Sequence, residues 1–166
     1  MSQFFFFIIF IFLSSLGLTY SFYRSAMRRG LVAMPNERSS HSIPTPTGAG
    51  LPVGIVLLFA IIFLYVIGSV STPLAFAFVG GGLALIIVGW IDVRRALPAR
   101  VRLVVHAIVA VWTLWWLGGV RTLDLGFATI SLGIVGTIIA FIALLWMSNL
   151  YNFMDGIDGL IGAEAV

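Results

Sequence analysis

The residues best suited to chemistry lie near the end of the sequence, in the stretch NLYNFMDGIDGL. It holds Asn149, Asn152, Asp155 and Asp158, which recur at every third position. On an α-helix a step of three residues rotates by about −60°, so neighbours in this series share a face. Two carboxylates so close together repel each other unless a cation or a shared proton offsets their charge. A Mg²⁺ ion bound to a diphosphate would do so, because Mg²⁺ prefers one or two carboxylates together with substrate phosphate oxygens; a solvated helix end is the alternative.

Two other polar segments carry groups of the same kind. PNERSSHSIPTPTGAG contains Arg38 and His41, which are suited to bind phosphate oxygens, although an ordinary basic loop has the same composition. DVRRALPARVR begins with Asp92 next to several arginines, and a local ion pair at a helix end is the simpler interpretation. His106 follows shortly after, and we interpret it as an interfacial histidine hydrogen-bonded to a neighbour.

The elements that must position these residues are apolar. Of the 166 residues 61% are hydrophobic and 9% are charged, whereas a soluble domain has about 25% charged residues. Five stretches are each close to the ~20 residues that cross a ~30 Å hydrocarbon core as a helix. They lack the alternation of barrel strands, so only helices are plausible. The sequence therefore predicts an all-α polytopic membrane protein, a single integral-membrane domain over 1–166, with about five transmembrane helices at 4–23, 51–70, 73–91, 103–119 and 127–147.

Arginine placement predicts the orientation. Eight of the nine basic residues, all of them arginine, fall in the segments 24–50 and 92–102 on one side of the spans, whereas the other side has Arg121, offset by Asp124. The positive-inside rule then puts the N-terminus outside and the C-terminus in the cytoplasm. The first span has no preceding charge and no cleavage site, which indicates an uncleaved anchor. The net charge of +3 is explained by topology and not by nucleic-acid binding. All three polar segments meet on the cytoplasmic face, which suits chemistry between a water-soluble molecule and a lipid headgroup.

Together the three segments resemble those of the bacterial polyprenyl-phosphate N-acetylhexosamine-1-phosphate transferases, relatives of phospho-N-acetylmuramoyl-pentapeptide transferase. NLYNFMDGIDGL is the most specific match, and the whole chain looks like the N-terminal half of a member. The resemblance implies Mg²⁺-dependent transfer of a sugar 1-phosphate from a UDP-N-acetylhexosamine to undecaprenyl phosphate. It implies a multi-pass protein of the bacterial inner membrane that starts O-antigen, lipopolysaccharide or other cell-envelope glycan synthesis. Its active face would be cytoplasmic.

The resemblance also implies roles for individual residues. Asp92 would be the first acid of the family's Asp-Asp pair and would activate or orient the lipid phosphate. The implied catalytic residues are all carboxylates, namely Asp92, Asp155 and Asp158, of which Asp155 and Asp158 would hold the metal. The implied substrate-binding residues are Arg38, His41, Asn149 and Asn152.

Several departures from the family pattern bear on activity. Val93 stands where the second acid of the pair is expected, Thr47 replaces an arginine and Ala49 replaces a glycine. The family continues for several more spans beyond Val166, so we expect this chain to be a truncated or inactive form. The alternative is a non-catalytic membrane subunit that binds polyprenyl phosphate or a full-length relative. A homodimer and association with a missing C-terminal half both stay open, as does the sugar. A transporter fragment is disfavoured, because the acids cluster at one end of the spans.

Overall fold

The computed structural model describes residues 2–33, 45–95 and 97–154. Most of these residues lie in helices, which confirms the predicted all-α class. The helices are α1 (Ser2–Arg29), α2 (Gly50–Val66), α3 (Thr72–Arg95), α4 (Ala99–Leu117) and α5 (Gly133–Met154). The short strands are β1 (Val32–Ala33), β2 (Thr45–Pro46), β3 (Thr122–Asp124) and β4 (Thr129–Ser131). Four helices in the described ranges are long and apolar enough to cross a membrane, and α2, with 17 residues, is at the short limit for doing so.

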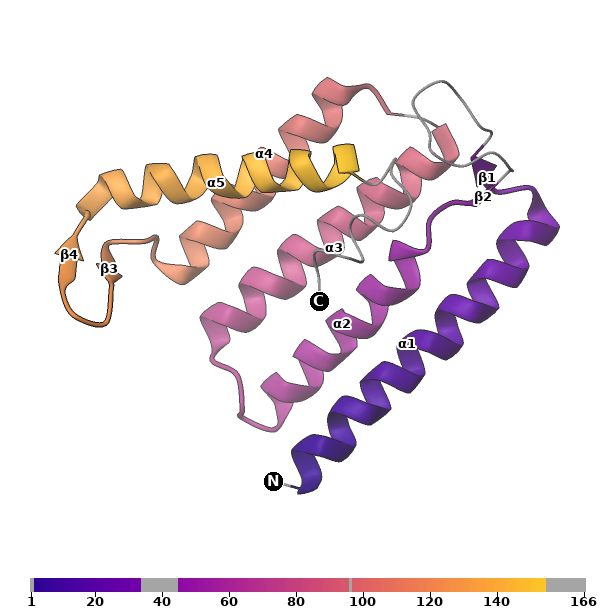
Figure 1. The fold of residues 1–166 in the computed structure, drawn as a ribbon, viewed down its shortest axis with the longest axis horizontal. Helices are drawn as coiled ribbons and strands as arrows, with labels where there is room; N and C mark the ends of the chain where they lie inside the picture. Colours follow the sequence, from indigo (N-terminus) through magenta and orange to yellow (C-terminus); the bar gives the residue numbers. More distant parts are fainter. Residues whose placement is uncertain (1, 34–44, 96, 155–166) are drawn as a thin grey trace.

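The helices pack against one another in chain order, α1 on α2, α2 on α3, α3 on α4 and α4 on α5. The direction reverses at each connection, as Figure 1 shows. The last turns of α1, α3 and α5 and the first turns of α2 and α4 therefore gather at one end, which we call the arginine end. The turn between α2 and α3 and the β3–β4 hairpin lie at the other end, which we call the hairpin end. This arrangement brings the arginine-bearing helix ends together.

Small residues fill the space between the helices. The buried apolar side chains among the described residues are no larger than valine: Ala26, Pro52, Val56, Ala60, Ala75, Ala77 and Ala110. A Cβ built on Gly80 would lie 2.6 Å from Nε1 of Trp112, so only glycine leaves room for that ring. The same Nε1–H donates to the carbonyl oxygen of Phe76, 2.9 Å away. Close approach over small residues, with larger apolar side chains facing outward, is typical of helices packed in a bilayer.

The predicted fifth span was wrong at its start. Residues 127–132 were expected to be helical, but Thr129–Ser131 forms β4, which pairs antiparallel with β3 and places Leu123 opposite Ile130. Two local features favour the hairpin. The Asp124 carboxylate accepts the Gly126 N–H at 2.8 Å, and Gly126 has a φ of 80°, so these residues form a turn. The β-branched residues that follow suit a strand better than a helix.

Other helix ends also differ from the predicted spans. The second span was predicted to reach residue 70, but α2 ends at Val66, where Gly68 adopts a φ of 73° and donates its N–H to the Tyr65 carbonyl. The fourth span was predicted to reach residue 119, and α4 ends at Leu117, where Gly118 caps it in the left-handed conformation. At the arginine end, α3 continues to Arg95 and α4 begins at Ala99. The polar segment 92–102 is therefore two helix ends and a short connection, and not a loop.

Candidate functional site

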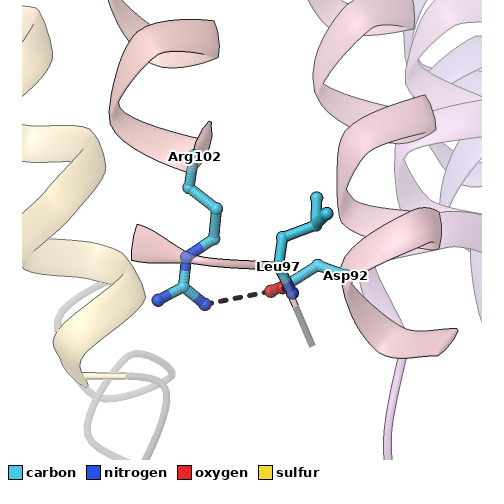
Figure 2. A network of polar contacts seen from close by, with 3 residues as sticks. All are labelled: Asp92, Leu97 and Arg102. Atoms are coloured by element: carbon cyan, nitrogen blue, oxygen red, sulfur yellow. Dashed lines mark hydrogen bonds and ion pairs between the residues drawn. The ribbon is translucent and has the colours of Figure 1, made fainter. Parts of the chain in front are cut away.

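Asp92 lies in the last turn of α3 and joins this helix to the start of α4. Its Oδ1 accepts the backbone N–H of Leu97 at 2.6 Å, and its Oδ2 accepts Nη1–H of Arg102 at 3.0 Å. Figure 2 shows both groups converging on the carboxylate from the connection and from α4. Both oxygens therefore have a fixed partner, and the direction of the carboxylate is set by a second helix.

The partner of Asp92 differs from the one that sequence proximity suggested. Arg94 and Arg95 are its neighbours in sequence, but the guanidinium of Arg94 lies over the Trp90 ring, 4.3 Å from the ring centroid. Arg102 is ten positions away and reaches Asp92 because α4 turns back beside α3. The side chains of Arg102 and Asp92 are 31% and 24% exposed, so the pair adds at most about 1 kcal/mol to stability. Its larger contribution is to hold the carboxylate in one orientation.

Position 93 faces a different segment from position 92. A Cβ built on Gly48 would lie 3.5 Å from Cγ2 of Val93 and 3.3 Å from the Phe22 ring. Val93 therefore packs against the base of the first polar loop, which the Phe22 ring of α1 also approaches, and its different direction is expected for adjacent helix positions, which are rotated by about 100°. An acid in place of Val93 would point toward the first loop, whereas Asp92 points toward α4.

The base of the first polar loop is tied together by backbone hydrogen bonds. β1 pairs with β2, with Val32 opposite Pro46, and the Thr47 N–H donates to the carbonyl oxygen of Leu31 at 3.1 Å. Thr47 and Ala49 lie next to this base. They are the two positions where the resemblance led us to expect an arginine and a glycine. Arg38 and His41 lie outside the described residues, so their predicted contact with phosphate stays a prediction.

The end of α5 carries the first members of the three-residue series. The helix continues to Met154, so Asn149 and Asn152 are both on helical backbone, as predicted. The side-chain amide of Asn149 donates to the carbonyl oxygen of Leu145 at 2.7 Å, and this bond leaves its own oxygen as an acceptor. Asp155 and Asp158 lie outside the described residues. Their predicted role as metal ligands therefore stays a prediction.

An apolar groove of about 620 Å³ extends from the arginine end into the bundle. It lies between α2, α3 and α4 and touches α5 at Leu144 and Ser148. Several glycines line it, and its side-chain polar groups belong to His106, Thr113 and Ser148. His106 is on α4, one turn beyond Arg102. Its Nδ1 is buried and has no hydrogen-bond partner among the described residues, so the predicted bond to a neighbour is not found at this atom.

Sequence reasoning missed two residues of this site. Arg102 was counted with the orientation-determining arginines, because no local pattern pairs positions that are ten apart across a helix connection. His106 was treated as an isolated interfacial residue. A signal was available for it, because Arg102 and His106 are four apart and therefore neighbours on one helix face.

The chain is similar to known proteins along most of its length. The sequence model described as glycosyl transferase family 4 matches residues 75–166. The undecaprenyl-phosphate alpha-N-acetylglucosaminyl 1-phosphate transferase of Yersinia pestis is 29% identical over 93% of this chain and 42% of its own length. The enzyme of that name from Salmonella typhimurium is 30% identical over 97% of this chain and 41% of its own. The decaprenyl-phosphate N-acetylglucosaminephosphotransferase of Mycolicibacterium smegmatis is 32% identical over 81% of this chain and 36% of its own length.

The chain spans about two fifths of the length of the curated relatives it matches. No solved structure matches it significantly.

Proposed function

The chain belongs to glycosyl transferase family 4, and from this premise we propose that it acts in the transfer of a sugar 1-phosphate from a UDP-sugar to undecaprenyl phosphate. The names of its relatives support a polyprenyl phosphate as acceptor and an N-acetylglucosamine phosphate as the transferred group. In this reaction a phosphate oxygen of the lipid bonds to the sugar-linked phosphorus of the donor. The bond from that phosphorus to the bridging oxygen breaks, and UMP leaves.

The observation that carries the proposal is the fixed carboxylate of Asp92 at the arginine end. Arg102 and the Leu97 N–H hold it in place, and Gly89 and His106, which line an apolar groove, lie about one helical turn from Asp92 and Arg102. This proximity suits a meeting of a lipid headgroup with a water-soluble nucleotide. We propose that Asp92 orients the lipid phosphate or takes its proton. The base of the first loop and the end of α5 lie at the same end of the bundle, so Arg38, His41, Asn149 and Asn152 are proposed to bind the donor.

We also propose that Asp155 and Asp158 hold Mg²⁺. Carboxylates are hard oxygen ligands of the kind that Mg²⁺ prefers, and the helical backbone up to Met154 supports their shared direction. The ion would offset the negative charge of two phosphate-bearing reactants when they meet. The protein's own part is to align the two substrates, and alignment by itself contributes strongly to such reactions.

The proposed setting is the bacterial inner membrane, with the arginine end in the cytoplasm. In the described residues, arginines lie on the ends of α1, α3 and α4 that form the arginine end, whereas Arg121 lies beside the hairpin. This asymmetry supports the orientation through the positive-inside rule. It also gives the candidate site access to a cytoplasmic sugar nucleotide.

A second candidate is a non-catalytic membrane subunit that binds polyprenyl phosphate without turning it over. The packing of Val93 favours it, because an apolar side chain occupies a position where the family pattern has an acid. Association with a full-length relative or with a chain that supplies the rest of the family fold belongs to this candidate.

The deciding experiment is to purify the full chain in nanodiscs and supply UDP-N-acetylglucosamine with a labelled sugar, undecaprenyl phosphate and Mg²⁺. Lipid-linked labelled product, absent when undecaprenyl phosphate is omitted, supports the transferase. Binding of undecaprenyl phosphate without product supports the subunit. A chain that neither binds the lipid nor forms product contradicts both.

A further inference from the structure

His106 has a polar atom without a partner in a part of the molecule that is otherwise apolar. Its Nδ1 is buried and accepts or donates no hydrogen bond among the described residues. Buried polar groups are almost always hydrogen-bonded, and each exception needs a physical explanation. The side chain as a whole is half-buried and lines the 620 Å³ groove.

The surroundings of Nδ1 determine whether the other ring nitrogen, Nε2, is a hydrogen-bond donor or an acceptor. In a neutral imidazole one nitrogen donates and the other accepts. A buried N–H without an acceptor is rarer in proteins than a buried acceptor without a donor. We therefore assign the lone pair to Nδ1 and the proton to Nε2. Nε2 is not among the buried atoms without a partner in the described residues, and as the protonated nitrogen it would select a ligand that brings an acceptor.

The groove indicates the rest of that ligand. Gly50 begins α2, and Gly89, His106 and Ser148 lie within about two turns of the ends of α3, α4 and α5 at the arginine end, while apolar residues continue the groove into the bundle. Thr113 lies seven positions further along the same face of α4. A molecule that fits has an acceptor at one end and an apolar chain behind it.

Arg102 adds positive charge at the same end. It is four positions before His106, so their Cβ atoms are about 5–6 Å apart on one face of α4. The structure shows one of its five N–H groups bonded to Asp92, and the others can reach a second anion. A donor from His106 and further donors from Arg102 together favour an anionic acceptor such as a phosphate.

We propose that His106 binds the phosphate of polyprenyl phosphate, with Nε2–H donating to a phosphate oxygen and the first isoprene units lying in the groove. This inference rests on the proposed function, because the identity of the lipid comes from it. It assigns a role to a residue for which the sequence indicated only an interfacial position, and it predicts that phosphate and chain are recognised by adjacent parts of α4.

The test is a binding titration of the full chain in phosphatidylcholine nanodiscs, with undecaprenyl phosphate as the probe and native mass spectrometry as the readout. His106→Leu keeps the apolar volume and removes the donor, so we expect binding about tenfold weaker. His106→Gln keeps a donor and should bind within about twofold of the wild type. Thr129→Val removes a hydroxyl from β4 at the hairpin end, outside the groove, and should leave binding unchanged.

Further ligands separate the headgroup from the chain. Undecaprenol has the same chain without the phosphate, and His106→Leu should not change its binding. Equal weakening of undecaprenol, or no effect of His106→Leu on undecaprenyl phosphate, would overturn the role of His106 while leaving the proposed function intact. Equal competition by phosphatidylglycerol or by inorganic phosphate would overturn the assignment to a polyprenyl lipid. A wild-type chain that binds no undecaprenyl phosphate would overturn both proposals.

Discussion

The two ends of the bundle are built from the same apolar helices but are closed in different ways. At the arginine end, side chains from one segment bind another: Asp92 of α3 bonds to Arg102 of α4, and Val93 packs on the base of the first loop. At the hairpin end, backbone bonds and turn residues do most of this work, as in the Leu132 N–H that donates to the Arg121 carbonyl at 2.8 Å.

The larger of the two cavities does not lie at the end that carries the candidate site. A cavity of about 790 Å³ lies at the hairpin end between α4 and α5, with walls that include Trp115 and Phe141. The groove at the arginine end is smaller, at about 620 Å³. Its lining residues Gly89 and His106 nevertheless lie about one helical turn from Asp92 and Arg102, which form the one ion pair found in the described part of the chain. Both cavities carry polar side chains, Arg121 and Thr137 at the hairpin end and His106, Thr113 and Ser148 at the arginine end. The arginine end adds a fixed carboxylate close to its groove, which is the kind of group that acid–base chemistry needs.

The first prediction has the largest consequence for the comparison of the two ends, because it tests which side of the membrane each end faces. The chain has no cysteine, so single cysteines can be introduced without a background. We expect Ala99→Cys at the arginine end to react with a membrane-impermeant maleimide only when the cytoplasmic face is exposed. Phe127→Cys at the hairpin end should react only from outside. Labelling of both from one side would contradict the proposed topology.

The second prediction compares the acids of the two ends. Asp92→Asn removes a candidate catalytic carboxylate, so we expect lipid-linked product to form roughly 10²-fold more slowly or worse. Asp124→Asn keeps an oxygen for the turn hydrogen bond to Gly126 and should leave the rate unchanged. Product formation is measured from labelled UDP-N-acetylglucosamine. Equal rates for Asp92→Asn and the wild type would remove Asp92 from the proposed mechanism.

The apolar spans were predictable from sequence because length and composition decide them. The fifth span was wrong at its start, because residues 127–132 are apolar enough for a span, while their β-branched residues and the Asp124–Gly126 turn favour a strand. The partners within the site were less predictable. Neither the pairing of Asp92 with Arg102 nor the contact of Val93 with the first loop follows from local spacing, because each joins segments that only the packing of the helices brings together.

The third prediction concerns glycines with positive φ at both ends. Gly119 at the hairpin end has a φ of 74°, and a Cβ there would run into the Thr137 hydroxyl, which accepts the Val120 N–H at 3.2 Å. Gly119→Ala should therefore lower the free energy of unfolding by roughly 2–4 kcal/mol, combining left-handed strain with a clash. Gly48→Ala at the arginine end, with a φ of 86° and its nearest atom in the Phe22 ring at 3.3 Å, should cost roughly 1–2 kcal/mol.

A matched control isolates the strain from the clash. Gly126 has a φ of 80° and open space around its missing Cβ, so Gly126→Ala should show the strain alone. Thermal unfolding in detergent gives the ranking. If Gly119→Ala is no more destabilising than Gly126→Ala, the packing of Thr137 against Gly119 is not a stabilising contact.

The fourth and smallest effect concerns arginines. Arg102→Gln at the arginine end breaks the ion pair with Asp92 and should cost at most about 1 kcal/mol, because both side chains are partly exposed. Arg121→Gln at the hairpin end has no carboxylate within 4 Å in the described residues to lose, so its effect on the melting temperature should be close to zero. High salt tests whether the difference in stability is electrostatic. Because ~1 M NaCl shortens the screening length to about 3 Å, the melting temperatures of the two variants should then become equal. A gap that persists at high salt would mean that Arg102 stabilises the α3–α4 corner through the packing of its aliphatic stem. In that case Arg102→Met, which keeps such a stem without the charge, should restore most of the lost stability.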